Sequence, residues 1–433
     1  MAKGAAGRAD EGGRGKLATD APRRFSALHN RNFALLWVGL VISNSGSWMQ
    51  IVAQGWLVYD LTNSPFLLGV VGAARATSMI IFPPLGGVIA DRVPRLKLLK
   101  VTQCISLALA FVLAVLVSTG MVQVWQIICI SFLSGLVNAF DQPTRQALIP
   151  DLVQRADLTN AVALNSAAWQ GSALFGPSLA GVMVAVIGLS GAFYANALSF
   201  LAVVTALFLM RGVPERSSAP RQRGLFDDLK EGLRYVRRTR LVFTLLLLSA
   251  ITSLFGRSYQ HLLPVFARDI FHQNAGGLGL MLSMPGAGTL VGATVIGAMG
   301  DVPHKGRVLF IGMLAASGLL ILFTATHVFP LALVLLFLIG VTNIVFSTMM
   351  STMLQLTAPG AMRGRVMSLM TVTMQGFAPV GALITGGLAT AIGTPLAMAL
   401  SALVVAFAAL LAARGAPAVR GFGHVHAEEV AAA

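Results

Sequence analysis

Charged residues are scarce in this chain. Only 11% of its 433 residues are Asp, Glu, Lys or Arg, whereas 56% are hydrophobic. Soluble domains carry about a quarter charged residues, so this composition excludes an ordinary soluble fold. Cysteine is scarce too: Cys104 and Cys129 fall in apolar runs that we expect at different depths, so we predict no disulfide between them.

Acidic residues are fewer than basic ones, with 16 Asp and Glu against 31 Lys and Arg and a net charge of +15. In a soluble protein such an excess would suggest nucleic acid. Here the basic residues gather between apolar runs, so the charge follows from membrane topology. We therefore expect a lipid bilayer as the partner and no nucleic acid.

Motifs for nucleotides, metals and catalysis are absent from the sequence. The stretch from Gly12 to Lys16 lacks the G-x4-G-K-[ST] spacing of a phosphate loop. His424 and His426 are too few for a metal site. No spacing of nucleophile and base suggests an active site. We expect no ATP, no cofactor, no metal and no enzymatic activity.

Twelve apolar segments are each long enough to cross a bilayer, which takes about 20 residues in a helix. They do not alternate as barrel strands do, and a helix satisfies its own backbone hydrogen bonds in lipid. The sequence thus predicts an all-α membrane protein with twelve transmembrane helices. The segments are approximately 33–60, 66–90, 97–119, 122–144, 160–187, 191–210, 241–268, 277–299, 307–326, 330–356, 365–388 and 394–413.

The basic residues predict the orientation of these helices. Of the 31 lysines and arginines, all except Arg75, Arg257 and Arg268 fall on one side of the membrane when the spans are numbered in order. Because such residues gather on the cytoplasmic side, we expect both termini in the cytosol of a bacterial-type cytoplasmic membrane. Residues 1–24 have no apolar stretch that would make a cleavable signal.

The segments divide the chain into five parts. We expect a disordered cytosolic tail at 1–30, a six-helix bundle at 31–210, a cytosolic linker at 211–240, a second six-helix bundle at 241–413 and a cytosolic tail at 414–433. In the linker, Phe226, Leu229, Leu233 and Val236 follow helical spacing, which predicts an amphipathic helix on the membrane surface.

The two bundles repeat one another. Ser43, Gly46 and Gln50 recur 210 residues later as Ser253, Gly256 and Gln260. Farther along, the pattern from Phe132 to Asn138 and the glycines of 171–181 recur with an offset of 205. The constant order and offset predict two pseudo-symmetric halves with a site between them.

Three motifs resemble those of the major facilitator superfamily. The loop G-G-V-I-A-D-R-V-P-R is similar to the superfamily's G-x-L-A-D-R-x-G-R-K, with Pro94 in place of a glycine. The stretch from Asp141 to Val153 looks like the branch of enterobactin exporters and macrolide-efflux carriers. In the fifth span, Gly176, Pro177 and Gly181 match the antiporter motif G-x3-G-P-x2-G-G, while Ser172 and Ala180 depart from it.

The resemblance implies a cytosolic gate. In the family the motif aspartate faces a helix start in the other half, where the helix dipole favours a carboxylate. We expect Arg95 to bridge Asp91 and Asp141; ordinary solvated ion pairs would explain the same residues. The expected gating set is Gly87, Asp91, Arg92, Arg95, Asp141 and Arg145, with Asp301 and Lys305 in the second half.

Polar residues inside spans point to a cavity. Arg75 and Arg257 are costly in lipid, so they face either a cavity or structural partners. His261 is either the carrier of a coupling proton or a satisfied polar residue. The expected cavity residues are Asn44, Trp48, Gln50, Gln54, Arg75, Arg257, Tyr259, Gln260 and His261. The spans contain no central carboxylate, which departs from many proton antiporters.

By resemblance, we expect a secondary transporter that exports a small molecule by alternating access in exchange for protons. Siderophores and amphiphilic drugs both suit the motifs, and the two arginines favour an anionic siderophore. An uptake symporter or facilitator on the same fold is one alternative. A non-transporting membrane sensor or assembly factor is another, and it would lack a polar cavity between the halves.

Overall fold

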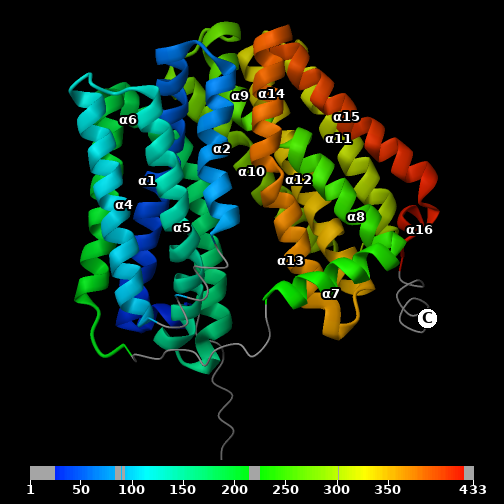
Figure 1. Cartoon of the computed structure of the whole chain (residues 1–433), viewed down its shortest axis with the longest axis horizontal. Coiled ribbons are helices and arrows are strands. Elements are labelled where there is room, and N and C mark those ends of the chain that lie inside the picture. The colour runs from blue at the N-terminus through cyan, green and yellow to red at the C-terminus, as the bar shows by residue number, and fades with distance from the viewer. Residues whose placement is uncertain (1–24, 83–88, 90–92, 214–224, 301, 424–433) are drawn as a thin grey trace, which may run out of the picture.

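The computed structural model describes residues 25–82, 89, 93–213, 225–300 and 302–423. The regular structure in these ranges is helical, in two groups that stand side by side (Figure 1). The N-terminal half contains α1 (Arg31–Thr62), α2 (Pro65–Ile81), α4 (Arg95–Ser118), α5 (Val124–Leu152) and α6 (Leu158–Leu209). The C-terminal half contains α8 (Arg240–Ile251), η3 (Thr252–Gly256), α9 (Tyr259–Val265), η4 (Phe266–Ile270), α10 (Ala275–Met299), α11 (Lys305–Ala325), α12 (Phe329–Thr357), α13 (Gly360–Gly376), α14 (Ala378–Ile392) and α15 (Thr394–Gly415).

The helices have the length and composition of membrane spans. Within the described ranges, ten helical segments are long and apolar enough to cross a bilayer, and Pro65–Ile81 is a shorter apolar helix. One of the ten, Arg155–Leu209, has 55 residues and contains a break at Gly188. The expected all-α membrane architecture is therefore present, and the exact number of twelve spans stays a prediction.

Polar caps define the first helices. The Asn30 side chain accepts hydrogen bonds from the backbone N–H groups of Asn32 and Phe33, at 3.0 and 3.2 Å, and so begins α1. Asn63 adopts a left-handed conformation that ends α1, and Ser64 caps α2 immediately afterwards. Left-handed Asn and an N-cap Ser are common choices at such ends, so local chemistry explains this tight turn.

The helix α5 is longer than hydropathy predicts. It continues to Leu152, whereas the apolar segment ends near residue 144. The added turns carry Arg145, which pairs with Asp141 one turn earlier, and Asp151, which pairs with Arg95 of α4. Because these charges are satisfied within the half, the helix continues through a stretch that hydropathy alone reads as a loop.

Two glycines mark the last turn of each half. Gly188, inside the range of α6, has φ 75° and ψ 177°, and Gly393, between α14 and α15, has φ 88° and ψ 149°. Only glycine adopts this region readily. The two positions are related by the offset of 205 found in the sequence, so the halves use the same device to reverse direction.

The packing reproduces the internal repeat. A Cβ added to Gly69 of α2 would lie 2.5 Å from the carbonyl oxygen of Ala382 in α14, and one added to Gly279 of α10 would meet the carbonyl oxygen of Pro177 in α6. These four residues form two pairs of repeat mates. The same contact thus joins the halves twice, as a pseudo-twofold arrangement requires.

The two halves meet mainly at one end of the molecule. We call it the Tyr59 end, and we call the opposite end, with Arg31, Arg95 and Arg240 at helix starts, the arginine-rich end. At the Tyr59 end the Tyr59 hydroxyl donates to the Asp269 carboxylate, and Arg268 lies 3.5 Å from Asp60. Figure 1 shows the ribbons of α2, α9 and α14 together at the top, and the halves diverging toward the bottom.

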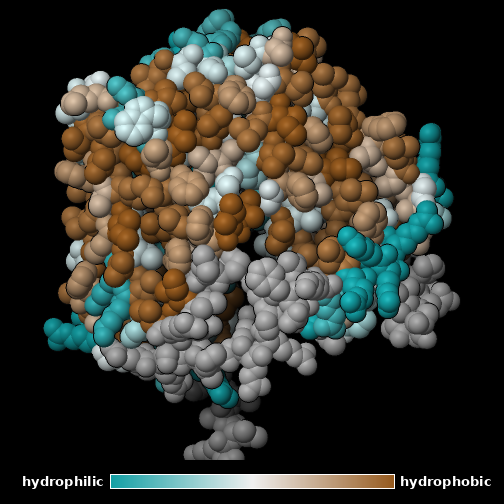
Figure 2. Space-filling view, viewed as in Figure 1, coloured by the Kyte–Doolittle hydropathy of each residue, from teal (hydrophilic) through white to brown (hydrophobic). Residues whose placement is uncertain are grey.

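An apolar surface surrounds this assembly. Figure 2 shows hydrophobic residues over most of the visible face, with hydrophilic ones at its upper and lower edges. Many of these side chains are well exposed, such as Val186 at 75% and Phe175 at 68%. Such a band is suited to lipid and would be a large apolar patch in water.

The expected linker and tail both touch the C-terminal half. The linker contains α7 (Leu225–Arg238), whose Glu231 pairs with Arg365 of α13 at 2.9 Å. The tail begins with α16 (Pro417–Arg420), and Val419 and Phe422 are buried. The first residues expected to form a free C-terminal tail are thus packed, whereas residues 1–24 of the expected N-terminal tail lie outside the described ranges.

Candidate functional site

A cavity of about 240 Å³ lies between the two halves. Its walls come from α1, α2, α5, α9, α10 and α14, so both halves contribute. The polar side chains on these walls are Trp48, Gln54, Arg75, Ser131, Gln260 and His261. Among the described residues that line it there is no Asp or Glu, which leaves the central cavity without negative charge.

Arg75 is the dominant charge of the central cavity. Within the described ranges its guanidinium group makes no ion pair or hydrogen bond, whereas its backbone carbonyl accepts a bond from Ser78 at 2.9 Å. The buried indole N–H of Trp48, on the same walls, has no hydrogen-bond partner either. Arg75 and Trp48 therefore offer unpaired donors to the cavity, an arrangement that suits an anion or an oxygen-rich molecule.

A buried chain of amides supports one wall. Asn196 of α6 donates to Gln50, Gln50 lies 3.4 Å from the oxygen of Gln54, and Gln54 donates to Ser131 at 2.6 Å. Gln50 was expected on the cavity wall. It lies instead one step behind it, where its hydrogen bonds fix the orientation of Gln54.

His261 reaches across the boundary between the halves. A Cβ on Gly72 would lie 2.7 Å from Cε1 of the His261 ring, so the ring rests directly on α2. Only a glycine leaves room there. Because the contact joins α2 to α9 at the cavity, movement of the halves would change the surroundings of this imidazole.

A second cavity of about 440 Å³ opens in the N-terminal half toward the arginine-rich end. Its lining is almost entirely amide and hydroxyl and contains Asn44, Gln142, Arg145, Asn165 and Gln170. Trp169 lines this polar vestibule and packs on Trp48 of the central cavity, with ring centroids 6.2 Å apart. The two tryptophans thus stand between the two spaces.

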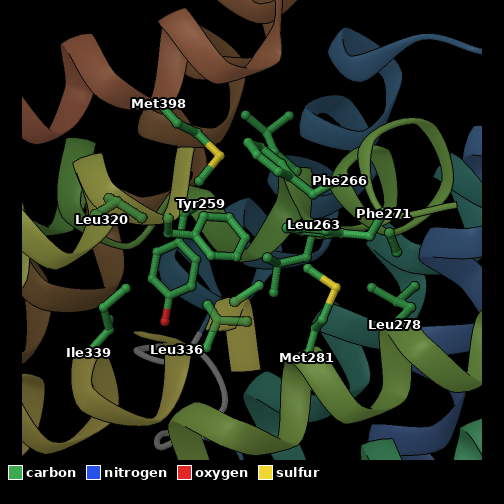
Figure 3. Close-up of a cluster of buried hydrophobic side chains, with 14 of the residues drawn as sticks. Tyr259, Leu263, Phe266, Phe271, Leu278, Met281, Leu320, Leu336, Ile339 and Met398 are labelled. Carbon is green, nitrogen blue, oxygen red and sulfur yellow. The ribbon is translucent and has the colours of Figure 1, made fainter. Parts of the chain in front are cut away.

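Arg257 and Tyr259 do not lie on the central cavity as expected. Arg257 borders a small pocket inside the C-terminal half. Tyr259 is 1% exposed within an apolar cluster, where its hydroxyl points toward Leu336 and Ile339 (Figure 3). The reason is local: the π-helical turn η3 shifts the register, so Gln260 and His261 face the cavity and the residues before them face the bundle.

The expected gating residues are only partly described. Gly87, Asp91, Arg92 and Asp301 lie outside the described ranges. Asp141 accepts hydrogen bonds from Thr102 at 2.9 Å and Gln103 at 2.8 Å and pairs with Arg145, so the expected bridge from Arg95 to Asp141 is wrong. Arg95 instead pairs with Asp151 at 2.6 Å, and the buried Lys305 donates to the carbonyl of Val302.

The antiporter-like motif lies at the boundary between the halves. A Cβ on Gly176 would meet Trp48, and one on Gly181 would lie 2.7 Å from the Cα of Gly276 in α10. Pro177 is buried beside them. The motif therefore permits close contact of α6 with α1 at Gly176 and with α10 of the other half at Gly181.

Sequence reasoning missed several participants. Ser131, Asn196, Trp169 and Asp151 all bond to or pack on residues of the site. Polar side chains inside apolar segments were the available signal for Ser131 and Asn196. Nothing in the sequence marks Asp151 as the partner of Arg95. Within the described part of the chain, no group of three or more His, Cys, Asp or Glu could hold a metal ion.

Two bundles related by a pseudo-twofold axis around a polar cavity define a membrane transporter of the major facilitator type. The family model described as "transmembrane secretion effector" matches residues 23–420. The chain belongs to this family of the major facilitator superfamily.

Curated relatives are transporters as well. The chain is 29% identical over 259 residues to the staphyloferrin A transporter of Staphylococcus aureus, an alignment that covers 58% of this chain and 63% of that protein. It is 24% identical over 393 residues to the multidrug efflux pump Tap of Mycolicibacterium fortuitum, covering 88% and 95%.

Solved structures share the fold. A bacterial homologue of the human lysosomal transporter Spinster, in an inward-facing and unoccupied conformation, superposes with a TM-score of 0.71 at 13% identity, over 90% of this chain and 98% of that one. A D-xylose–proton symporter gives 0.67 at 13% identity, over 92% and 100%.

Proposed function

We propose that this transporter exports a small, oxygen-rich anionic or amphiphilic molecule by alternating access, in exchange for protons. The observation that carries the proposal is the central cavity, in which the guanidinium group of Arg75 lies without a counter-charge among the described residues. A siderophore with carboxylate groups fits this cation. An amphiphilic drug would use Trp48 and the apolar walls instead.

The relatives support export. Tap of Mycolicibacterium fortuitum is named as an efflux pump, and the staphyloferrin A transporter handles a siderophore by its name. The lysines and arginines support an orientation with the arginine-rich end in the cytosol. In that orientation the polar vestibule faces the cytosol, so a substrate would pass Asn44 and the two tryptophans before it reaches Arg75.

The proposed gate at the arginine-rich end comprises the motif residues Gly87, Asp91, Arg92 and Arg95, with Asp301 and Lys305 as the repeat mates of Asp91 and Arg95. What supports it is the density of charge on the neighbouring described helices, where the Arg95–Asp151 ion pair and the hydrogen bonds of Thr102 and Gln103 to Asp141 link α4 to α5. Closing this end and opening the Tyr59 end would complete the transport cycle.

His261 is the proposed carrier of the coupling proton. It lines the central cavity and touches Gly72 of the opposite half, so its surroundings change when the halves move. A carrier of this kind must be exposed to each side in turn. The described cavity walls hold no Asp or Glu, so this imidazole is the side chain on them best suited to take up and release a proton.

Everted membrane vesicles test the proposal. The probes are labelled staphyloferrin A and ethidium, each supplied outside the vesicles with and without a respiratory proton gradient. We expect one of them to accumulate inside when the gradient is present and to leak out when an uncoupler collapses it.

Accumulation only in right-side-out vesicles would support the uptake alternative and contradict export. Equal accumulation with and without the gradient would contradict proton coupling. If neither probe moves in either orientation while the purified protein binds one of them, the sensor alternative gains support.

A further inference from the structure

The C-terminal half contains a small pocket that is separate from the central cavity. Its volume is about 40 Å³, and it lies among η3, α11, α12 and α15. A water needs about 10–15 Å³ on this measure, so the pocket has room for a single small ion with a water or two and is too small for an organic substrate. Its polar lining comes from Thr252, Arg257, Ser317, Thr342 and Asn343.

Three donors in this pocket have no acceptor. Within the described part of the chain, Arg257 makes no ion pair or hydrogen bond through its guanidinium group. The buried hydroxyls of Thr252 and Ser317 have no hydrogen-bond partner either. Many hydroxyls in the apolar helices bond back to the preceding turn, as Thr289 does to Pro285 at 2.8 Å and Ser401 to Ala397 at 2.9 Å. Thr252 and Ser317 do not, and these two orphan hydroxyls share a location with an unpaired cation.

Comparison of the halves explains how the pocket arises. In the N-terminal half, the space beside Gly46 is filled: a Cβ there would lie 2.7 Å from the side-chain oxygen of Asn196 and would also meet Ser199. By the offset of 205, the mates of Asn196 and Ser199 are Ser401, which bonds back to Ala397 of its own helix, and Val404. Beside the repeat mate Gly256, α15 therefore has no amide that fills the space, and Arg257 lines the pocket there together with Ala402 and Val405.

The π-helical turn η3 directs Arg257 into this space. Thr252–Gly256 forms five residues of π-helix within a span whose mate, α1, is a continuous α-helix. Such single-turn bulges recur at functional sites because they change which residues face a neighbour. Here the bulge also removes Thr252 from the usual bond to the preceding turn, so its hydroxyl is free to serve a ligand.

We propose that this pocket binds a small monovalent inorganic anion of the size of chloride. A guanidinium group with two hydroxyl donors in a low-dielectric bundle supplies charge and hydrogen bonds for one such anion. The anion in turn neutralises a cation that is costly inside a membrane protein. The site is independent of the proposed export function, because it lies within one half and is lined by none of the polar residues of the central cavity.

Thermal unfolding of the purified transporter in detergent tests the site. The anion is varied at constant ionic strength between sodium chloride and sodium gluconate, which is too large for the pocket. We expect chloride to raise the melting temperature of the wild type by several degrees in a saturable way, because a ligand bound only to the folded state stabilises it. Ser317→Ala, which keeps the cation, should move the half-saturating chloride concentration upward several-fold.

Arg257→Met should lose the chloride effect entirely, while Arg75→Met, the matched change at the other arginine inside a span, should keep it. If Arg257→Met fails to fold, Ser317→Ala and Thr252→Val still decide the matter through their half-saturation points. Equal melting of the wild type in both salts, or an unchanged chloride response in all pocket variants, would overturn the proposal. Neither result bears on uptake into vesicles, so the export proposal stands or falls separately.

Discussion

At the scale of single residues, Arg75 distinguishes this cavity from a merely polar one. It projects from α2 into a space whose described walls hold no carboxylate. Its position is supported from behind, because Ser78 bonds both to the carbonyl of Arg75 and to that of Phe132 in α5, at 2.9 Å each. The cation is thus held on a firmly packed helix. A guanidinium group fixed in this way favours specific recognition of an anion more than a flexible charge on the surface would.

Replacing Arg75 should therefore weaken transport of an anionic substrate. A hydrogen bond to a charged partner is worth about 1.5–3 kcal/mol, so Arg75→Gln should raise KM about tenfold or more. Uptake into everted vesicles measures this. Arg75→Lys keeps the charge and should lose less. The matched control is Arg155→Gln, which alters an exposed cation outside both cavities and should transport normally.

The two arginines inside spans show what sequence reasoning can and cannot reach. Their cost in lipid predicts that each faces a cavity or a structural partner. Arg75 lines the central cavity, whereas Arg257 lies in the pocket of the C-terminal half. The difference comes from the π-helical turn before Arg257, and hydropathy contains no signal for a change of register within an apolar run.

At the scale of elements, the glycine turns at Gly188 and Gly393 set the geometry of the last two spans in each half. Both have open space around them, since a Cβ at either position would meet nothing within 4 Å. Their requirement for glycine is therefore purely one of backbone conformation. The glycines between packed helices differ, because an added Cβ there would clash with the neighbouring helix.

Alanine at these turns should destabilise the protein through strain alone. Residues held in this region cost about 1–3 kcal/mol when they are not glycine, so Gly188→Ala and Gly393→Ala should each lower the melting temperature. Gly318→Ala is the control: it lies within α11, also in open space, and should be neutral or slightly stabilising. If all three variants melt alike, the backbone conformation of the turns is not what the structure shows.

The elements themselves were largely predictable, because a helix that crosses lipid must be long and apolar. Their ends were less so. The extension of α5 to Leu152 is held by the ion pair between its Asp151 and Arg95 of α4, which is a contact between helices. Turns that depend on local chemistry, such as Asn63–Ser64, can be read from the sequence, whereas those that depend on tertiary partners cannot.

At the scale of the whole molecule, the internal repeat carries most of the predictive information. Tyr59 and Asp269 are related by the offset of 210, and they contact each other across the two halves. A contact between repeat mates must lie near the pseudo-twofold axis, so it holds the halves together at their centre. The repeat in the sequence predicts the pseudo-twofold axis. It does not predict which end of the molecule is closed, because that depends on the balance of contacts between the halves at the two ends.

A crosslink between the halves tests whether they must separate at the Tyr59 end. Asp60 of α1 and Arg268 of η4 belong to different halves, and their charged atoms lie 3.5 Å apart, so a short bifunctional thiol reagent should join cysteines placed there. In a background with Cys104→Ser and Cys129→Ser, Asp60→Cys/Arg268→Cys should transport before treatment with the reagent and lose transport after it. The control pair Ser118→Cys/Tyr194→Cys joins α4 and α6 within one half, so its crosslink should leave transport intact. Normal transport by the crosslinked first pair would mean that substrate leaves by a route that does not require this end to open.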